Sequence, residues 1–206
     1  NYNSVNGTTA TINVAKATPT ITWATPSSIV AGTLLSGTQL NASANAIYNS
    51  VNTPVAGTFT YTPVSGTQVT LAGTSTLSTN FTPTDSANYN SVNGTTVVLT
   101  TVPGPISQIE LAASPTSLDI TSASTLTVTG KDQYGNVVTN NSTTPVILSV
   151  DNGALATTRL TLTSGVKTTT LSRSSAGASI VNAFTVLSGS LASAEATVTF
   201  TDGSHN

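Results

Sequence analysis

The feature that most restricts the fold of this 206-residue chain is an internal repeat. Residues 1–9 read NYNSVNGTT, and residues 88–96 read NYNSVNGTT again. The first copy continues as ATINVAK and the second as VVLTTVPG, and both continuations are rich in residues typical of strands. A repeat at this period indicates tandem modules of roughly 90 residues.

The rest of the chain also has the pattern of β-strands. Thr, Val and Ile dominate, no window keeps apolar residues at helical spacing, and turn signals recur about every 8–12 residues. We therefore expect an all-β chain with two antiparallel β-sandwiches. The expected strands are 18–24, 39–44, 57–62, 68–71, 75–81 and 95–102 in the first sandwich, and 106–113, 125–131, 146–150, 159–162, 167–172, 178–187 and 194–200 in the second.

Each sandwich should bury its largest apolar side chains. In the first half these are Trp23, Phe59, Tyr61 and Phe81, and Trp23 is expected in the core rather than on the surface as a sugar-stacking platform. The expected core of the second half is Ile109, Leu126, Val128, Ile147, Leu162, Leu171, Val181, Phe184, Val198 and Phe200.

The sequence Pro103-Gly104-Pro105 marks the predicted boundary between the two sandwiches. Lys16 and Asp85 are the only charged residues before it, and the other ten follow it. Proline cannot donate to a strand ladder, so a strand should end here. We predict a terminal strand of a preceding repeat at 1–16, a first sandwich at 17–103 and a second at 104–206.

Residues 1–16 need a partner under this division, because a lone strand leaves its backbone donors and acceptors unpaired. The segment is expected to fray, to fold back onto the next module or to pair with another molecule. Two explanations stay open: the sequence is cut from a longer protein at this point, or the strand is donated to a neighbouring subunit. A donated strand would present Tyr2, Val5, Ile12 and Val14.

The composition excludes several classes of function. Charged residues make up 6% of the chain, the net charge is −2, and there is one His and no Cys. Five basic residues cannot neutralise a nucleic-acid backbone. Most catalytic and metal chemistry draws on the residue types that are scarce here. We therefore expect no enzyme, no cofactor and no nucleic-acid partner.

The nearly uncharged surface predicts side-by-side assembly or a coat of sugars. Thr and Ser together form about a third of the chain, and such a surface repels its own copies weakly. The lack of Cys and Met suits an extracellular location. The sequence has no stretch of about 18 apolar residues, which membrane insertion would require. The Asn-x-Ser/Thr sequons, of which most are expected by chance in this composition, are Asn6, Asn41, Asn80, Asn93, Asn140 and Asn141.

The residues capable of chemistry are scattered. The acids lie mostly beside turns, where solvated carboxylates are expected, and His205 near the end has no nucleophile in a recognisable motif. Asp132 and Asn136 are weak candidates for Ca²⁺ ligands, although a hairpin turn with Gly135 in the left-handed region explains their spacing better. Lys16 and Asp85 are candidates for a Lys–Asn isopeptide site with a buried acid, although a solvated pair is the simpler interpretation.

Three motifs of the first half resemble the immunoglobulin-like repeats that occur in tandem in large bacterial and archaeal surface proteins. They are TITW at 20–23, GTFTYTP at 57–63 and FTPTDSANY at 81–89. The second half resembles the immunoglobulin-like modules of invasin and intimin, through KDQYGNVV at 131–138 and ATVTF at 196–200. The resemblance implies two tandem immunoglobulin-like sandwiches in a surface-exposed stalk or adhesin, without catalytic residues.

Three functions remain open at this point. The first is a structural segment of a cell-surface protein, in a stalk, surface layer, filament or adhesin array, with adjacent repeats or further copies as partners. The second is an adhesive module for carbohydrate or a host protein, for which Tyr48 and Tyr134 are the aromatic residues expected in loops. The third is an accessory module of a secreted hydrolase.

Overall fold

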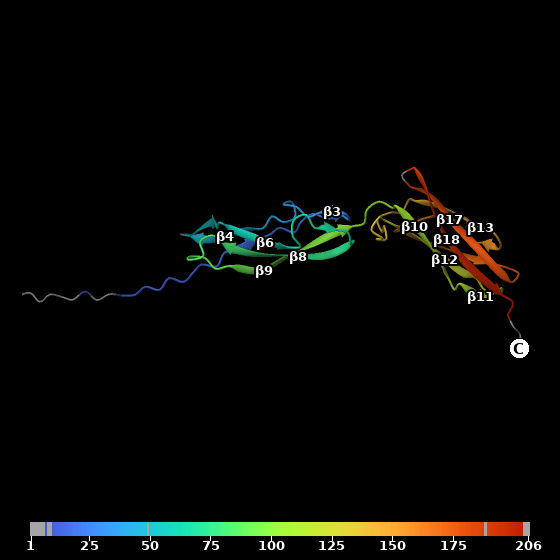
Figure 1. The fold of residues 1–206 in the computed structure, drawn as a ribbon, viewed down its shortest axis with the longest axis horizontal. Helices are drawn as coiled ribbons and strands as arrows, with labels where there is room; N and C mark the ends of the chain where they lie inside the picture. Colours follow the sequence, from blue (N-terminus) through green and yellow to red (C-terminus); the bar gives the residue numbers. More distant parts are fainter. Residues whose placement is uncertain (1–6, 8–9, 49, 188, 204–206) are drawn as a thin grey trace, which may run out of the picture. The chain divides into compact units, whose positions relative to one another are not determined.

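The computed structural model describes residues 7, 10–48, 50–187 and 189–203, and the regular elements in this part of the chain are all strands (Figure 1). The predicted all-β class is confirmed. None of these residues lies in a helix long and apolar enough to cross a membrane. The chain forms two compact units, the first from Asn1–Ser27, Leu34–Thr67 and Ser75–Leu99, and the second from Ser28–Thr33, Gln68–Thr74 and Thr100–Asn206.

Nine strands occur among the described residues of the first half of the chain. They are β1 (Thr20–Thr22), β2 (Ile29–Val30), β3 (Thr33–Leu34), β4 (Ser43–Tyr48), β5 (Val51–Pro54), β6 (Gly57–Thr62), β7 (Gln68–Val69), β8 (Gly73–Pro83) and β9 (Val92–Val102). They form sheets of order β1-β4-β5, β2-β9-β8-β6 and β3-β7.

Aromatic side chains fill the core of the first unit. Phe81 is fully buried and packs with Ala44, Ala46 and Val55, so β4 and β8 face each other across this core. The ring of Phe59 lies 4.8 Å from that of Phe81 between centroids. Trp23 is buried as expected, and its indole N–H donates to the carbonyl of Gln39 at 2.9 Å. The predicted core of this half is therefore confirmed for Trp23 and Phe81, while Phe59 and Tyr61 are only partly buried.

The second half, as far as the structure describes it, also has nine strands. They are β10 (Gln108–Ser114), β11 (Ser117–Asp119), β12 (Ser124–Lys131), β13 (Pro145–Val150), β14 (Ala154–Leu155), β15 (Arg159–Thr161), β16 (Val166–Ser172), β17 (Gly177–Leu187) and β18 (Ser190–Thr201). One sheet has the order β10-β12-β16-β14 and the other the order β11-β18-β17-β13-β15.

The two sheets of the second half share one hydrophobic core. Alternation along β12 turns Leu126 and Val128 inward, where they join Val181, Val198 and Phe200 from the opposite sheet. All five are almost completely buried. Sheets of a sandwich are held in this way, by the apolar rows of both inner faces.

Two predicted core residues of this half are wrong. Ile147 is 48% exposed, because β13 turns Val146 and Leu148 inward instead. Phe184 is only partly buried and lies directly across the ladder from Ile147 on the outer face. Since side chains alternate between faces, Ile147 and Phe184 face away from the core, while their neighbours Val146, Leu148 and Ala183 face it.

The segment before β1 has a different environment. Residues 10–16 take no strand conformation, and all of them are exposed. It hydrogen-bonds to the rest of the first unit at Lys16, whose carbonyl accepts from Nδ2 of Asn90 at 3.4 Å, and at Ala17, whose N–H donates to the carbonyl of Asn88 at 2.8 Å. The carbonyl of Ala17 accepts from the N–H of Asn90 at 2.8 Å. The predicted donor residues Ile12 and Val14 lie on this exposed segment, while Tyr2 and Val5 lie outside the described residues.

Candidate functional site

Four aspartates cap turns, and one of them differs from the others. Asp85 and Asp151 are exposed and Asp119 is half-buried, and each accepts hydrogen bonds from nearby backbone N–H groups. Asp85 and Asp151 fit the prediction of solvated turn carboxylates. Asp132 is 1% exposed, which makes it the exception.

The Asp132 carboxylate is surrounded by hydrogen-bond donors. Its Oδ1 accepts from the backbone N–H groups of Tyr134 and Asn136, both at 2.9 Å. Its Oδ2 accepts from the N–H of Gly104 at 3.0 Å and from Nδ2 of Asn136 at 2.9 Å. Gly135 has φ +85°, as expected for the left-handed residue of this turn. The turn after β12 is thereby tied to the chain at Gly104.

These hydrogen-bond donors also determine whether the buried carboxyl group of Asp132 is ionised. Burial by itself raises the pKa of Asp132, because it removes water from the charged form. The hydrogen bonds from the Asn136 side chain and from the N–H groups of Gly104, Asn136 and Tyr134 outweigh burial and hold the pKa of Asp132 below its usual value. Asp132 is therefore a carboxylate at neutral pH.

Asn136 extends this cluster to the turn that precedes β8. Its Nδ2 donates to the carbonyl of Thr70 at 2.7 Å, and its Oδ1 accepts from the N–H of Ala72 at 3.0 Å. Both segments belong to the second unit. One amide side chain thus bonds to the carboxylate of Asp132 and to two backbone groups of residues 68–74.

Tyr134 makes the remaining contact of this turn. Its hydroxyl accepts from Nε2 of Gln68 at 3.2 Å. Its ring lies against Gly32, where an added Cβ would stand 2.4 Å from the Tyr134 hydroxyl. Gly32 has φ +98°, so both its backbone and this close approach require glycine. We call Gly104, Asp132, Tyr134 and Asn136, with their partners at residues 32, 68, 70 and 72, the Asp132 clasp.

The clasp does not have the donor set of a calcium site. A hard cation needs several oxygens pointing at one place. Here N–H groups point at both Asp132 oxygens, and the Asn136 oxygen accepts from Ala72. No group of three His, Cys, Asp or Glu side chains able to hold a metal occurs in the part of the chain that the structure describes.

The other predicted site residues lie apart from the clasp. Lys16 and Asp85 are both exposed, so the shielding from water that an isopeptide site needs is lacking there. The Asp85 carboxylate accepts from the side chain of Asn88 and the N–H groups of Asn88 and Ala87, which lower the pKa of Asp85. It is a local turn cap. His205 lies outside the described residues.

The sequons differ in their exposure. Asn41, Asn80, Asn93 and Asn140 are exposed, and Asn141 is half-buried. Asn141 uses its Oδ1 to accept from the N–H groups of Thr143 and Thr144. Asn6 lies outside the described residues. An attached sugar at the exposed positions stays a prediction.

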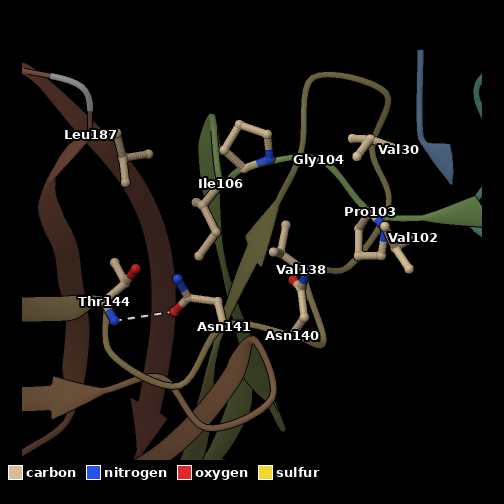
Figure 2. Close-up of a pocket in the computed structure, with 11 residues that line it drawn as sticks. Val30, Val102, Pro103, Gly104, Ile106, Val138, Asn140, Asn141, Thr144 and Leu187 are labelled. Carbon is tan, nitrogen blue, oxygen red and sulfur yellow. Dashed lines mark hydrogen bonds between the residues drawn. The ribbon is translucent and has the colours of Figure 1, made fainter. Parts of the chain in front are cut away.

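Figure 2 shows an open pocket of about 480 Å³ in the second unit. Apolar side chains, among them Val30, Val138 and Leu187, line it beside Asn140 and Asn141. The Oδ1 of Asn141 accepts from the N–H of Thr144, so this oxygen is already engaged within the chain. The pocket therefore has apolar surface but few polar groups to confer specificity.

The sequence contained one signal for the clasp. The motif Asp-x-x-Gly-Asn predicted the turn and its left-handed glycine. It did not predict that Asp132 is buried or that Asn136 bonds to Thr70 and Ala72, because these two partners lie 66 and 64 residues before Asn136 in the chain. Tyr134, expected in a loop, lies in this turn and is half-buried against Gly32.

No protein-family model and no curated protein sequence matches the chain. Solved structures similar to it include the D00–D0 domain of intimin, at 21% identity over 71% of this chain and 78% of that one, with a TM-score of 0.42. The adhesin InvE of Yersinia pseudotuberculosis is 19% identical over 77% of this chain and 52% of that one, with a TM-score of 0.38. A glycosyl hydrolase family 2 member from Bacteroides cellulosilyticus is 16% identical over 65% of this chain and 18% of that one, with a TM-score of 0.44.

Intimin, whose modules the second half resembles in its motifs, is thus among the structures similar to this chain. The superpositions are partial, and the assignment of the fold rests on the strands, sheets and cores described above.

Proposed function

We propose that this chain is a structural segment of an extracellular cell-surface protein, in which immunoglobulin-like sandwiches serve as spacers in a stalk, surface layer, filament or adhesin array. Its partners would be adjacent repeats of the same protein or further copies of it. It would have no catalytic activity of its own. The accessory module of a secreted hydrolase stays the sequence-based alternative.

The Asp132 clasp is the observation that carries this proposal. It is the one place among the described residues where a buried carboxylate gathers several donors, and an enzyme would use such a group on a substrate. Here both oxygens of Asp132 accept from N–H groups of the chain, and Asn136 also bonds to Thr70 and Ala72. The hydrogen bonds of Asp132 and Asn136 thus hold segments of the chain together.

The long ladder of the second half supports a mechanical role. β17 and β18 pair antiparallel from Gly177 with Phe200 to Leu187 with Ser190. The hydrogen bonds of this ladder run across the strands, so a force that slides β17 and β18 past each other loads many bonds together, whereas separation from the open end at Gly177 and Phe200 loads them one pair at a time. A spacer that experiences tension would use this geometry.

Force spectroscopy on the full chain, held at its two ends, tests the proposal. The wild-type chain should unfold in discrete force peaks, and Asp132→Ala should lower the force of one peak. Asp85→Ala is the matched control, because it removes an exposed turn aspartate and should leave the peaks unchanged. Extension without force peaks, or equal peaks in all three proteins, would contradict the mechanical role.

A patch on the β4–β5 hairpin favours adhesion as a second candidate function. Ile47, Tyr48 and Val51 are all exposed there, which is unusual for three large apolar side chains within five residues. A tyrosine beside apolar neighbours suits a sugar ring or a protein surface. Binding to a glycan array that is lost in Tyr48→Ala would support this function, and an array without signal would count against carbohydrate.

A further inference from the structure

The two copies of the repeat can be aligned beyond their nine identical residues. Asn1 corresponds to Asn88, so residues 10–15, ATINVA, correspond to 97–102, VVLTTV, without a gap. Residues 97–102 belong to β9, which lies between β2 and β8 in its sheet. The structure of the second copy therefore tells which side of the first copy would face a core.

The apolar residues of the first copy fall on the inward side of this alignment. In β9, Leu99 is 0% exposed and Thr101 is 3% exposed, while Val98 and Thr100 point outward. The residues aligned with Leu99 and Thr101 are Ile12 and Val14. Those aligned with the outward positions are Thr11 and Asn13, which are polar.

The observed environment of the first copy is the opposite of the one that its pattern requires. Ile12 is 84% exposed and Val14 is 86% exposed. Two β-branched apolar residues at alternate positions with polar neighbours are the pattern of a strand with one buried face.

We propose that residues 10–15 form the last strand of a sandwich whose remaining strands come from another copy of residues 17–87, placed before this segment in the protein. In that sandwich Ile12 and Val14 take the places of Leu99 and Thr101, next to strands equivalent to β2 and β8. The exposed apolar side chains of Ile12 and Val14 would then pack into the core of a preceding repeat. This inference concerns assembly and holds or fails independently of the spacer function.

The same alignment indicates how consecutive repeats follow each other. Ala17, which bonds to Asn88 and Asn90 through its backbone, aligns with Gly104, whose N–H donates to Asp132. Both residues come directly after the strand and one residue of linker. A backbone anchor at this position is therefore common to both copies, while the partner differs.

The first experiment tests the equivalence of the two strands in the full chain. Residues 97–101, VVLTT, are replaced by ATINV, the residues 10–14, and in a matched control by TINVA, the residues 11–15. The two grafts have the same composition, but the control places Thr, Asn and Ala inward instead of Ala, Ile and Val. We expect the first graft to keep a melting temperature within about 5 °C of the wild type, and the control to lower it by about 10 °C or more, since a register shift exposes the apolar row. Equal loss in both grafts, or equal tolerance, would overturn the equivalence.

The second experiment tests the packing into a preceding repeat. A chain with an extra copy of residues 17–87 fused before Asn1 is compared with the original chain by hydrogen exchange. The amides of residues 10–15 should exchange at least about 100-fold more slowly in the longer chain, because they become part of a sheet. Ile12→Asn with Val14→Asn should abolish this protection in the longer chain and leave the melting temperature of the original chain unchanged.

Two results would reject the proposal. The first is equally fast exchange of residues 10–15 in both chains. The second is protection of these residues in the original chain alone that rises with protein concentration, which would place the strand on a neighbouring molecule.

Discussion

Two turns of this chain contain the same pair of residue types, Asp and Asn, but the pair has a different role in each. The turn after β8 has Asp85 followed by Asn88, and the turn after β12 has Asp132 followed by Asn136. In both, the carboxylate accepts from backbone N–H groups and from the Asn side chain, and in both the pKa of the Asp is lowered. Asp85 is exposed and its bonds stay within its own turn, whereas Asp132 is buried and bonds to Gly104 as well.

The comparison indicates that burial, and not the local motif, decides how much a turn aspartate contributes to the stability of the fold. Water can replace each bond of Asp85 when the carboxylate is removed. The N–H of Gly104 lies in a buried site, so loss of the Asp132 carboxylate leaves this donor without a partner.

The largest effect is expected from Asp132→Ala. The substitution leaves the N–H groups of Gly104, Tyr134 and Asn136 without their acceptor, and we expect a loss of about 3 kcal/mol in the free energy of unfolding. Urea denaturation followed by circular dichroism measures it. Asp85→Ala is the control, and it should shift the midpoint much less. Comparable shifts in the two variants would contradict the role of burial.

A somewhat smaller effect is expected from Asn136→Ala. It removes the bonds to Thr70, Ala72 and Asp132 but keeps the carboxylate and its backbone donors, so we expect a loss of about 2 kcal/mol. Hydrogen exchange should also show faster exchange of the Ala72 amide. Asn88→Ala removes the corresponding amide of the exposed turn. An unchanged Ala72 amide in Asn136→Ala would show that the clasp does not hold residues 68–74.

Thr101→Val should stabilise the protein, because it removes a buried hydroxyl group that has no hydrogen-bond partner among the described residues. The Thr101 hydroxyl has no hydrogen-bond partner in the described chain, and the residue aligned with it in the first repeat copy is Val14. Removing a buried unsatisfied hydroxyl at constant shape should raise the free energy of unfolding by about 1 kcal/mol. Differential scanning calorimetry should show a higher melting temperature. Thr100→Val, at the exposed neighbouring position, should have no such effect.

The smallest effect near neutral pH is expected from pH itself. The pKa of Asp132 in the folded protein lies below its ordinary value of 3.8, so the unfolded chain takes up this proton first as the pH falls. The stabilisation is complete above about pH 5 and is lost as the pH falls through the folded pKa. The difference in stability between wild type and Asp132→Asn should therefore be constant from pH 8 to pH 5 and shrink below about pH 4. A difference that grows in acid would contradict the sign.

The sequence predicted most of the longer strands well and missed several short ones. β6 agrees with the predicted 57–62, and β12, β13, β16 and β17 each begin one residue before their predicted starts and end where predicted. β4 begins four residues after the start of the predicted 39–44, and the short strands β2, β3, β5, β11 and β14 were not predicted. A strand of two to four residues has too few positions to show alternation, and its existence depends on the ladder beside it, as with β2 against Thr101 and Val102 of β9.

What the sequence determined by itself is the all-β character, the buried aromatic core around Trp23 and Phe81, and the turn chemistry at Gly135. These follow from residue preferences and spacings within a few positions. Only the tertiary structure decided that Asp132 is buried, that Asn136 reaches Thr70 and Ala72, and that β13 turns Val146 rather than Ile147 inward. Burial and register depend on segments far apart in the chain, and a local pattern carries no information about which distant backbone groups will lie beside it.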